Sequence, residues 1–333
     1  MKRPRIRKNC FLLALALFLG MGTSFAAQFS AVCSTGQTLY YNIISTTDHQ
    51  VQLTFPGNYS TPYPSNFPKP TGNITLPSAV SYNGETYTVV MIGPRTFMNC
   101  SGLTGSLTIP NSVIEIGDNA FDGCTGFTGN LTVGNSVTKI DYMAFSGCSG
   151  FTGSLTLGNK VSEIGYAAFS DCGGFTGSLT IPNSVTAIDG FAFKNCSGFT
   201  GSLTLGNSLA TIGMSAFSSC SGFTGLLTLP NSLTSIGDHA FNRCSGFTGP
   251  LVIPDSVTEI VNYAFYYCTG FTGSLTIGNS VTSIGSYAFN GCDNLRSATF
   301  GNSVTTIGES AFSGCYHLAT VTVLPETPPT LGT

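Results

Sequence analysis

Apolar and polar residues alternate along most of this chain in short stretches that recur at a fixed period. In residues 178–182, Leu179 and Ile181 alternate with polar neighbours, which is typical of a strand with one buried face. A second short extended stretch, 185–188, follows within the same period. The remaining segment around Ala192-Phe193 is too short for a full helix. We predict a single helical or 3₁₀ turn there.

The cysteines measure the period of this pattern. Nine of them are 24 residues apart and a tenth follows after 23: Cys100, Cys124, Cys148, Cys172, Cys196, Cys220, Cys244, Cys268, Cys292 and Cys315. Self-similarity at about 20 to 29 residues is typical of leucine-rich-repeat solenoids, whose copies bury their apolar residues only by stacking. We therefore predict an α/β repeat solenoid, mostly β with short helical or 3₁₀ turns. Its right-handed coil should have about 23–24 residues per turn and a β-rich N-terminal cap.

The pattern changes before the regular repeats begin. Residues 1–27 combine a basic start, an apolar run and small residues before Ala27, which is typical of a signal peptide. Residues 28–72 contain two strand-like stretches and a proline-rich connection, and we predict that they form the N-terminal β-rich cap. Residues 73–98 form a degenerate first repeat, and Asn83-Gly84 indicates a hairpin insert within it.

The regular part, the leucine-rich-repeat solenoid, spans residues 99–325, and 326–333 form a C-terminal tail. No obvious cap follows the last repeat. An uncovered terminal coil leaves strand edges and apolar side chains in water. We expect either that this end pairs with another surface, including end-on self-association, or that the tail is truncated relative to a natural extension.

Charge and export restrict the function classes. Cleavage after residue 27 would remove five of the 12 Lys and Arg residues and leave 15 acidic residues, a net charge of −8. Nucleic acid is therefore not expected as a partner. No other apolar stretch approaches membrane-spanning length, so no transmembrane segment is expected after signal cleavage. We predict a secreted or cell-surface protein.

A longer motif appears when the copies are aligned. Ile-Pro-Asn-Ser-Val-Thr-x-Ile-Gly-x-x-Ala-Phe-x-x-Cys is nearly intact at 109–124 and 181–196. This motif resembles the BspA-like, or Treponema-type, leucine-rich-repeat family from residue 73 to about 325, and the insert at 82–87 resembles the entry repeat of bacterial members. The resemblance implies a secreted or cell-surface adhesin that binds host matrix proteins or other cells.

One position of the motif departs from the pattern. The glycine after the second-strand Ile is replaced by Asp141, Asp189 and Val261. If this glycine adopts positive φ, Asp tolerates the conformation and valine does not. We therefore predict a shifted turn in the copy that contains Val261.

The repeated polar and sulfur residues suggest chemistry, and each is weighed against a structural role. Stacked cysteines of an exported chain allow a disulfide ladder, but their side chains are parallel and point inward. A buried row of reduced thiols is therefore favoured. A repeated Asn, with Asp255 at one place, is expected to bond turn backbones. His49, His239 and His317 lie in three different regions and no phosphate loop is present, so no enzyme, cofactor or metal is expected.

Binding residues are sought where the copies differ. The two residues before Ala-Phe and the residue before each cysteine vary freely, so we expect them to face outward. Aromatic side chains, which anchor interfaces, gather at or beside these positions. The candidate binding residues are Tyr142, Tyr166, Phe191, Tyr263, Tyr266, Tyr267 and Tyr287. The alternative is that these rings merely lie flat over the edge of the coil.

Three non-enzymatic functions follow from this sequence. The first is adhesion or protein–protein interaction with extracellular proteins, among them host matrix proteins, or with other cells. The second is glycan binding at the cell surface, against which the absence of tryptophan counts. The third is a structural envelope component that self-associates end to end.

Overall fold

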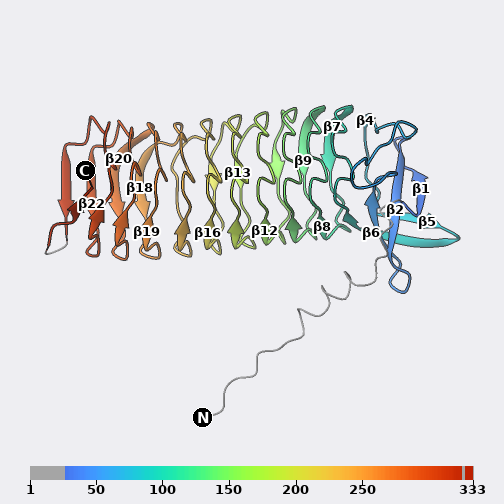
Figure 1. Cartoon of the computed structure of the whole chain (residues 1–333), viewed down its shortest axis with the longest axis horizontal. Helices are drawn as coiled ribbons and strands as arrows, with labels where there is room; N and C mark the ends of the chain where they lie inside the picture. Colours follow the sequence, from blue (N-terminus) through green and yellow to red (C-terminus); the bar gives the residue numbers. More distant parts are fainter. Residues whose placement is uncertain (1–26, 325–326, 333) are drawn as a thin grey trace, which may run out of the picture.

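The computed structural model describes residues 27–324 and 327–332, so the predicted signal peptide lies outside the described residues except for Ala27. These residues form a rod of stacked coils, with the N-terminal strands at one end and the last coil at the other (Figure 1). Each regular coil contributes one short extended segment to each of two opposite faces. The predicted solenoid is thereby confirmed.

The first face consists of the strands that end in the repeated Ile. These strands pair in parallel and in register, as Ile116 does with Ile140. One ladder joins β6 (Glu85–Ile92), β8 (Glu115–Ile116), β10 (Lys139–Ile140), β12 (Glu163–Ile164), β14 (Ala187–Ile188), β16 (Thr211–Ile212) and β17 (Ser235–Ile236). A separate ladder joins β19 (Glu259–Ile260), β21 (Ser283–Ile284), β23 (Thr306–Ile307) and β25 (Thr330–Leu331).

The second face consists of the Leu-Thr strands and has more interruptions. Its first ladder contains β4 (Gly72–Asn73), β7 (Leu103–Thr108), β9 (Phe127–Thr132) and β11 (Leu155–Thr156). The next contains β13 (Leu179–Thr180) and β15 (Leu203–Thr204). The last contains β18 (Gly249–Ile253), β20 (Phe271–Ile277), β22 (Ser297–Phe300) and β24 (Thr320–Val323).

These interruptions follow the identity of one buried residue. Where it is Val133 or Ile181, the strand pairs with the next coil. Where it is Leu157 or Leu205, the strand does not pair with the coil that follows. The coil of Leu229 has no strand on this face and only an isolated bridge between Gly225 and Phe247. Residues branched at Cβ suit a pleated, half-buried strand better than leucine does. The branched side chain therefore favours the ladder on this face.

The N-terminal end is closed by antiparallel strands. β1 (Phe29–Val32) pairs with β2 (Thr38–Ser45), which pairs with β3 (Gln50–Thr54), and β3 runs parallel to β6. β5 (Ala79–Tyr82) forms a hairpin with β6 and projects from the rod (Figure 1). This hairpin holds Asn83-Gly84 at its tip, where the sequence indicated a two-residue turn.

The α/β description and the helical turns predicted around Ala-Phe are wrong, because the described residues contain no helix. In this segment, N–H groups bond alternately within the coil and to the next coil. Ala120 N–H donates to the Gly117 carbonyl (3.1 Å), whereas Phe121 N–H donates to the Ala144 carbonyl (2.7 Å). Asn119, which directly precedes these two residues, adopts a left-handed φ of 55°. This conformation stops a helix from propagating.

The core is a set of columns that run along the rod. The phenylalanines of successive Ala-Phe pairs stack face to face, with ring centroids 5.3 Å apart for Phe145 and Phe169 and 5.2 Å for Phe169 and Phe193. The cysteines form a second buried column. Their thiols are free, and from Cys124 onward each donates to a phenylalanine carbonyl of the preceding coil, as Cys196 Sγ does to the Phe169 carbonyl at 3.0 Å.

The glycine after the second-strand Ile has a different role from the one considered above. Gly237 does not adopt positive φ. A Cβ there would lie 2.5 Å from the Met214 nitrogen, so glycine is needed because the coils approach closely. Asp141 keeps its N–H bond to the Ile116 carbonyl at 2.9 Å, but at Val261 the ladder ends between β17 and β19.

The shifted turn predicted at Val261 is wrong, because the turn that follows keeps the left-handed residue found in other coils, Tyr263 at φ 57°. What changes at this coil is the strand pairing, which ends at β17 and resumes at β19.

Candidate functional site

The candidate site lies along the edge of the rod where the turns stack. We call this surface the turn edge and define it by the two residues before each Ala-Phe pair and the two residues after it. The residue immediately before the alanine, such as Met143 or Tyr263, has a left-handed backbone in every regular coil, and so does the residue before each cysteine. Because all coils share these conformations, they belong to the scaffold and leave the side chains free to vary.

The expectation that both residues before Ala-Phe face outward is correct for the first and wrong in part for the second. Tyr142 and Tyr166, at the first position, are exposed. Asn119, Ala167 and Ser215, at the second, are buried. The left-handed backbone directs its N–H to the next coil, as Asn119 N–H does to the Tyr142 carbonyl (2.8 Å), and the side chain then lies against the coil edge.

Three predicted residues form one group, which we call the first aromatic row: Tyr142, Tyr166 and Phe191. The rings of Tyr142 and Tyr166 stack with centroids 5.6 Å apart and an interplanar angle of 7°. The Phe191 ring contacts Tyr166 at 5.2 Å and is tilted by 56°. The Lys194 ammonium lies 5.2 Å from the Phe191 ring centroid. This row presents ring edges, phenol hydroxyls and one cation.

The other four predicted residues form the second aromatic row, together with a residue that sequence reasoning missed. Tyr263 stacks on Tyr287 with centroids 5.0 Å apart and contacts Tyr266 at 5.4 Å. Tyr266 contacts Tyr267 at 4.5 Å. On the other side of Tyr263, the His239 ring stacks at 4.5 Å. His239 occupies the same repeat position as Tyr263, so aligning the copies by position rather than by aromatic type would have found it.

The two rows are not one continuous group. The coil between them presents Met214, which is exposed, and Ser215, which is buried. The structure therefore places the seven predicted residues in two separate groups, three in the first aromatic row and four in the second.

One acidic side chain lies at the end of the second row and accepts a hydrogen bond from it. The Tyr287 hydroxyl donates to Glu309 Oε1 at 2.8 Å. This bond to a carboxylate raises the pKa of Tyr287, so its phenol remains a neutral donor. The row thus ends in a hydrogen-bonded acid, while the first row contacts a lysine.

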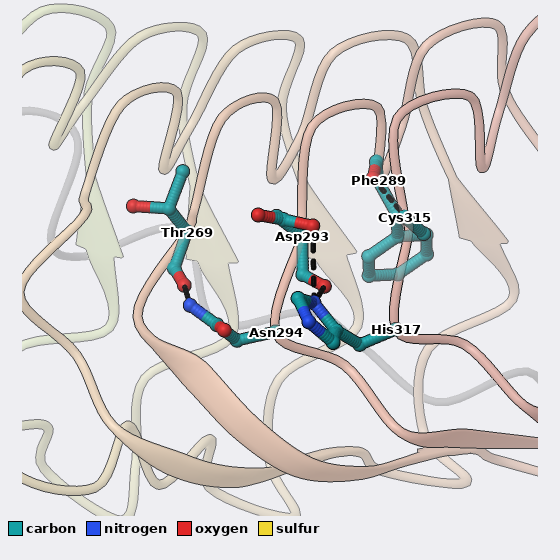
Figure 2. Close-up of polar contacts among 6 residues, drawn as sticks. All are labelled: Thr269, Phe289, Asp293, Asn294, Cys315 and His317. Atoms are coloured by element: carbon teal, nitrogen blue, oxygen red, sulfur yellow. Dashed lines mark hydrogen bonds and ion pairs between the residues drawn. The ribbon is translucent and has the colours of Figure 1, made fainter.

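Polar groups elsewhere do not form a second site. Burial, together with the neighbouring Asp141, raises the pKa of Glu115 to about 7, and Lys139 Nζ contacts Asp141 at 2.5 Å. Near the C-terminal end, His317 Nδ1 lies 3.2 Å from Asp293 Oδ1 and 2.9 Å from its carbonyl (Figure 2). Among the described residues, no group of three or more His, Cys, Asp or Glu side chains is placed to hold a metal ion.

The cysteine column is chemically protected. Complete burial raises the pKa of Cys244, Cys268 and Cys292 well above that of an ordinary thiol. A protonated, buried thiol is a poor nucleophile. These side chains serve the core: the Cys292 thiol donates to the Phe265 carbonyl at 3.1 Å, and Figure 2 shows Cys315 beside Phe289 of the preceding coil.

Comparisons with known proteins agree with this architecture. The sequence profile described as "BspA type Leucine rich repeat region" matches in 6 copies, over residues 90–224, 176–249 and 248–331. Among curated proteins, no match was found. In the part of the chain that the structure describes, no helix is long and apolar enough to cross a membrane.

Several solved structures resemble the rod. A leucine-rich repeat protein from Bacteroides ovatus is 26% identical, with 89% of each chain covered and a TM-score of 0.51. A leucine rich cell surface protein from Faecalibacterium prausnitzii is 22% identical, with 90% of this chain and 96% of that chain covered and a TM-score of 0.35. A leucine rich repeat protein of T. pallidum is 20% identical, covering 84% and 87%, with a TM-score of 0.35.

Proposed function

Because this chain belongs to the BspA-type leucine-rich-repeat family, as its repeat motif indicated, we propose that it is an exported, non-catalytic protein that binds other proteins outside the cell. Its partners are host or matrix proteins or the surfaces of other cells, and the contact it makes is adhesive. The basic, apolar and small-residue order of residues 1–27 supports export to the cell surface or medium.

The observation that carries this proposal is the pair of aromatic rows on the turn edge. Tyr142, Tyr166 and Tyr267 are exposed on this edge. Tyrosine supplies a large contact area with few rotatable bonds, and such residues anchor protein interfaces. The stacked coils beneath hold these rings in place without help from a ligand.

The way the rings stack favours protein over glycan as the ligand. Tyr142 covers one face of Tyr166, and Tyr263 and Tyr287 are parallel to within 2°. A sugar ring needs an open aromatic face, and Tyr263, which lies between the parallel rings of His239 and Tyr287, offers none. The edges and hydroxyls that remain outward suit hydrogen bonding and packing against protein. Glycan binding stays as the alternative outcome of the same assay.

The test is saturable binding of residues 28–333 to immobilised matrix proteins, mucins and a glycan array. The variant Tyr263→Ser/Tyr266→Ser/Tyr267→Ser/Tyr287→Ser should lose binding by at least about tenfold, since interface anchors each contribute about 2 kcal/mol or more. Tyr316→Ser is the matched control, because Tyr316 is highly exposed but lies outside both rows.

If the control also lost binding, or if the quadruple tyrosine variant kept it, the binding site would lie outside the second aromatic row. Saturable binding confined to glycans would replace the protein ligand by a sugar, and no binding to any surface would remove the adhesive function.

A further inference from the structure

The chain contains two Asn-Gly pairs, Asn83-Gly84 and Asn290-Gly291. In such a pair the backbone nitrogen of the glycine can attack the side-chain carbonyl carbon of the asparagine, because glycine has no Cβ to crowd the approach. The reaction requires a nitrogen that is not held in a hydrogen bond and an asparagine side chain that is able to rotate toward it. The structure places the two pairs in opposite surroundings.

The first pair forms the tip of the hairpin between β5 and β6, which projects from the rod (Figure 1). Both residues are exposed, and their φ angles of 52° and 84° are typical of a two-residue hairpin turn. A Cβ on Gly84 would meet no atom within 4 Å. Within residues 27–324 and 327–332, neither the Gly84 N–H nor the Asn83 side chain has a hydrogen-bond partner. Both reacting groups are therefore accessible in the folded chain.

The second pair lies in an interior turn, where neighbouring coils are in contact. Gly291 N–H donates to the Ser313 carbonyl at 2.8 Å, and the Asn290 amide donates to the Ser310 carbonyl at 3.4 Å. Gly291 is buried, and a Cβ on it would lie 3.1 Å from the Tyr267 ring. Attack by this nitrogen requires that the contact between two coils open first, which costs free energy. The same dipeptide is thus protected here.

We propose that Asn83 is a site of spontaneous deamidation in the folded protein. The Gly84 nitrogen gives up its proton and forms a bond to Asn83 Cγ. The bond from Cγ to Nδ2 breaks, and ammonia leaves with that proton. Water then opens the resulting five-membered succinimide at either of its two carbonyls, which yields aspartate or isoaspartate. Water is the only co-reactant, and the oxidation state of the residue does not change.

The modification changes the hairpin in two ways. Either product adds a negative charge at the tip, beside Glu85. Isoaspartate also inserts one carbon into the backbone of a turn whose length sets the register of the two strands. Tyr82 pairs with Glu85 next to the turn, and the Tyr82 ring stacks on Phe29 of β1 with centroids 4.2 Å apart. We expect this end of the hairpin to loosen while the coils stay as they are.

Peptide mapping by mass spectrometry, on folded residues 28–333 kept at physiological temperature and neutral pH, tests the proposal. The peptide with Asn83 should gain the mass of an amide-to-acid change at least about tenfold faster than the peptide with Asn290, because reaction at Asn290 must wait for local opening. In concentrated urea the two rates should converge, since unfolding removes the protection of Asn290. Asn83→Gln is the matched control: it keeps the amide but would need a six-membered ring, so the change at position 83 should stop while Asn290 reacts as before.

Two further readouts identify the reaction. The rate at Asn83 should rise with pH, because the Gly84 nitrogen must lose its proton, and chromatography should resolve both aspartate and isoaspartate. In aged samples the amides of Tyr82 and Glu85 should exchange hydrogen faster, while those of the coils should not. Equal rates at the two sites in the folded chain, aspartate as the sole product, a rate independent of pH, or an unaltered hairpin after conversion would each overturn the proposal.

Discussion

The interior columns and the turn edge are built by the same coils, yet they differ in what repetition fixes. In the interior, phenylalanine and cysteine recur at the same place in nearly every coil, and ring stacks such as Phe169–Phe193 and Phe193–Phe217 have centroids 5.2 and 5.3 Å apart. On the turn edge, equivalent positions hold tyrosine, methionine, histidine or serine over an unchanged backbone. Stability therefore resides in the columns, and recognition can vary along the edge without changing the fold.

The largest effect should come from emptying the phenylalanine column. Phe193→Ala removes a fully buried ring that contacts rings on both sides, and it should lower the free energy of unfolding by about 3–5 kcal/mol. Phe191→Ala, two residues away on the turn edge, removes the same side chain from a half-buried place and should cost less than half as much. Urea denaturation measures both, and equal losses would erase the distinction between column and edge.

The thiol column should show an intermediate effect. Cys196→Ala removes the donor to the Phe169 carbonyl and leaves a small void, so unfolding should become easier by about 1–3 kcal/mol. Cys196→Ser keeps a donor and should fall between the alanine variant and the unchanged chain. If serine destabilised more than alanine, the thiol would act only as an apolar filler, and its hydrogen bond would contribute nothing.

The interrupted face should respond to a single branched side chain. Leu205→Ile is expected to join β15 to the coil that follows it and to stabilise the chain by up to about 1 kcal/mol. Hydrogen exchange should show slower exchange at Leu203, whose N–H points to that coil. Ile181→Leu makes the reverse change and should open the contact between β13 and β15, which is now paired. No change in exchange for either variant would mean that another residue sets the ladder.

A further effect on stability depends on pH. Glu115 is a carboxyl whose pKa burial and Asp141 raise to about 7, above the unfolded value, so the folded state binds its proton more tightly. This contribution is present below about pH 4.5 and is lost as pH rises toward 7. Glu115→Gln should flatten thermal stability between pH 5 and 8, relative to the unchanged chain. An unaltered pH profile would mean that this carboxyl is solvated.

The sequence was sufficient to predict the columns and both strand faces, because inward positions such as Leu179 and Ile188 follow from alternation and period alone. It was insufficient for the turn edge. The left-handed conformation at Met143 or Tyr263 results from hydrogen bonds to the next coil, a tertiary effect that local propensity does not report. The glycine after the second-strand Ile is needed where the backbones of neighbouring coils approach closely. This need, like the interrupted strand pairing at Val261, depends on the distance between coils.

The most direct test of the account is to measure binding and unfolding on the same pair of variants. Tyr263→Ser/Tyr287→Ser changes only the turn edge, while Phe193→Leu changes only the column. We expect the tyrosine variant to lose binding by at least about tenfold while its free energy of unfolding changes by less than about 1 kcal/mol. The leucine variant should lose stability and, while folded, bind as the unchanged chain does. Binding that follows stability in both variants would contradict the separation of scaffold from recognition surface.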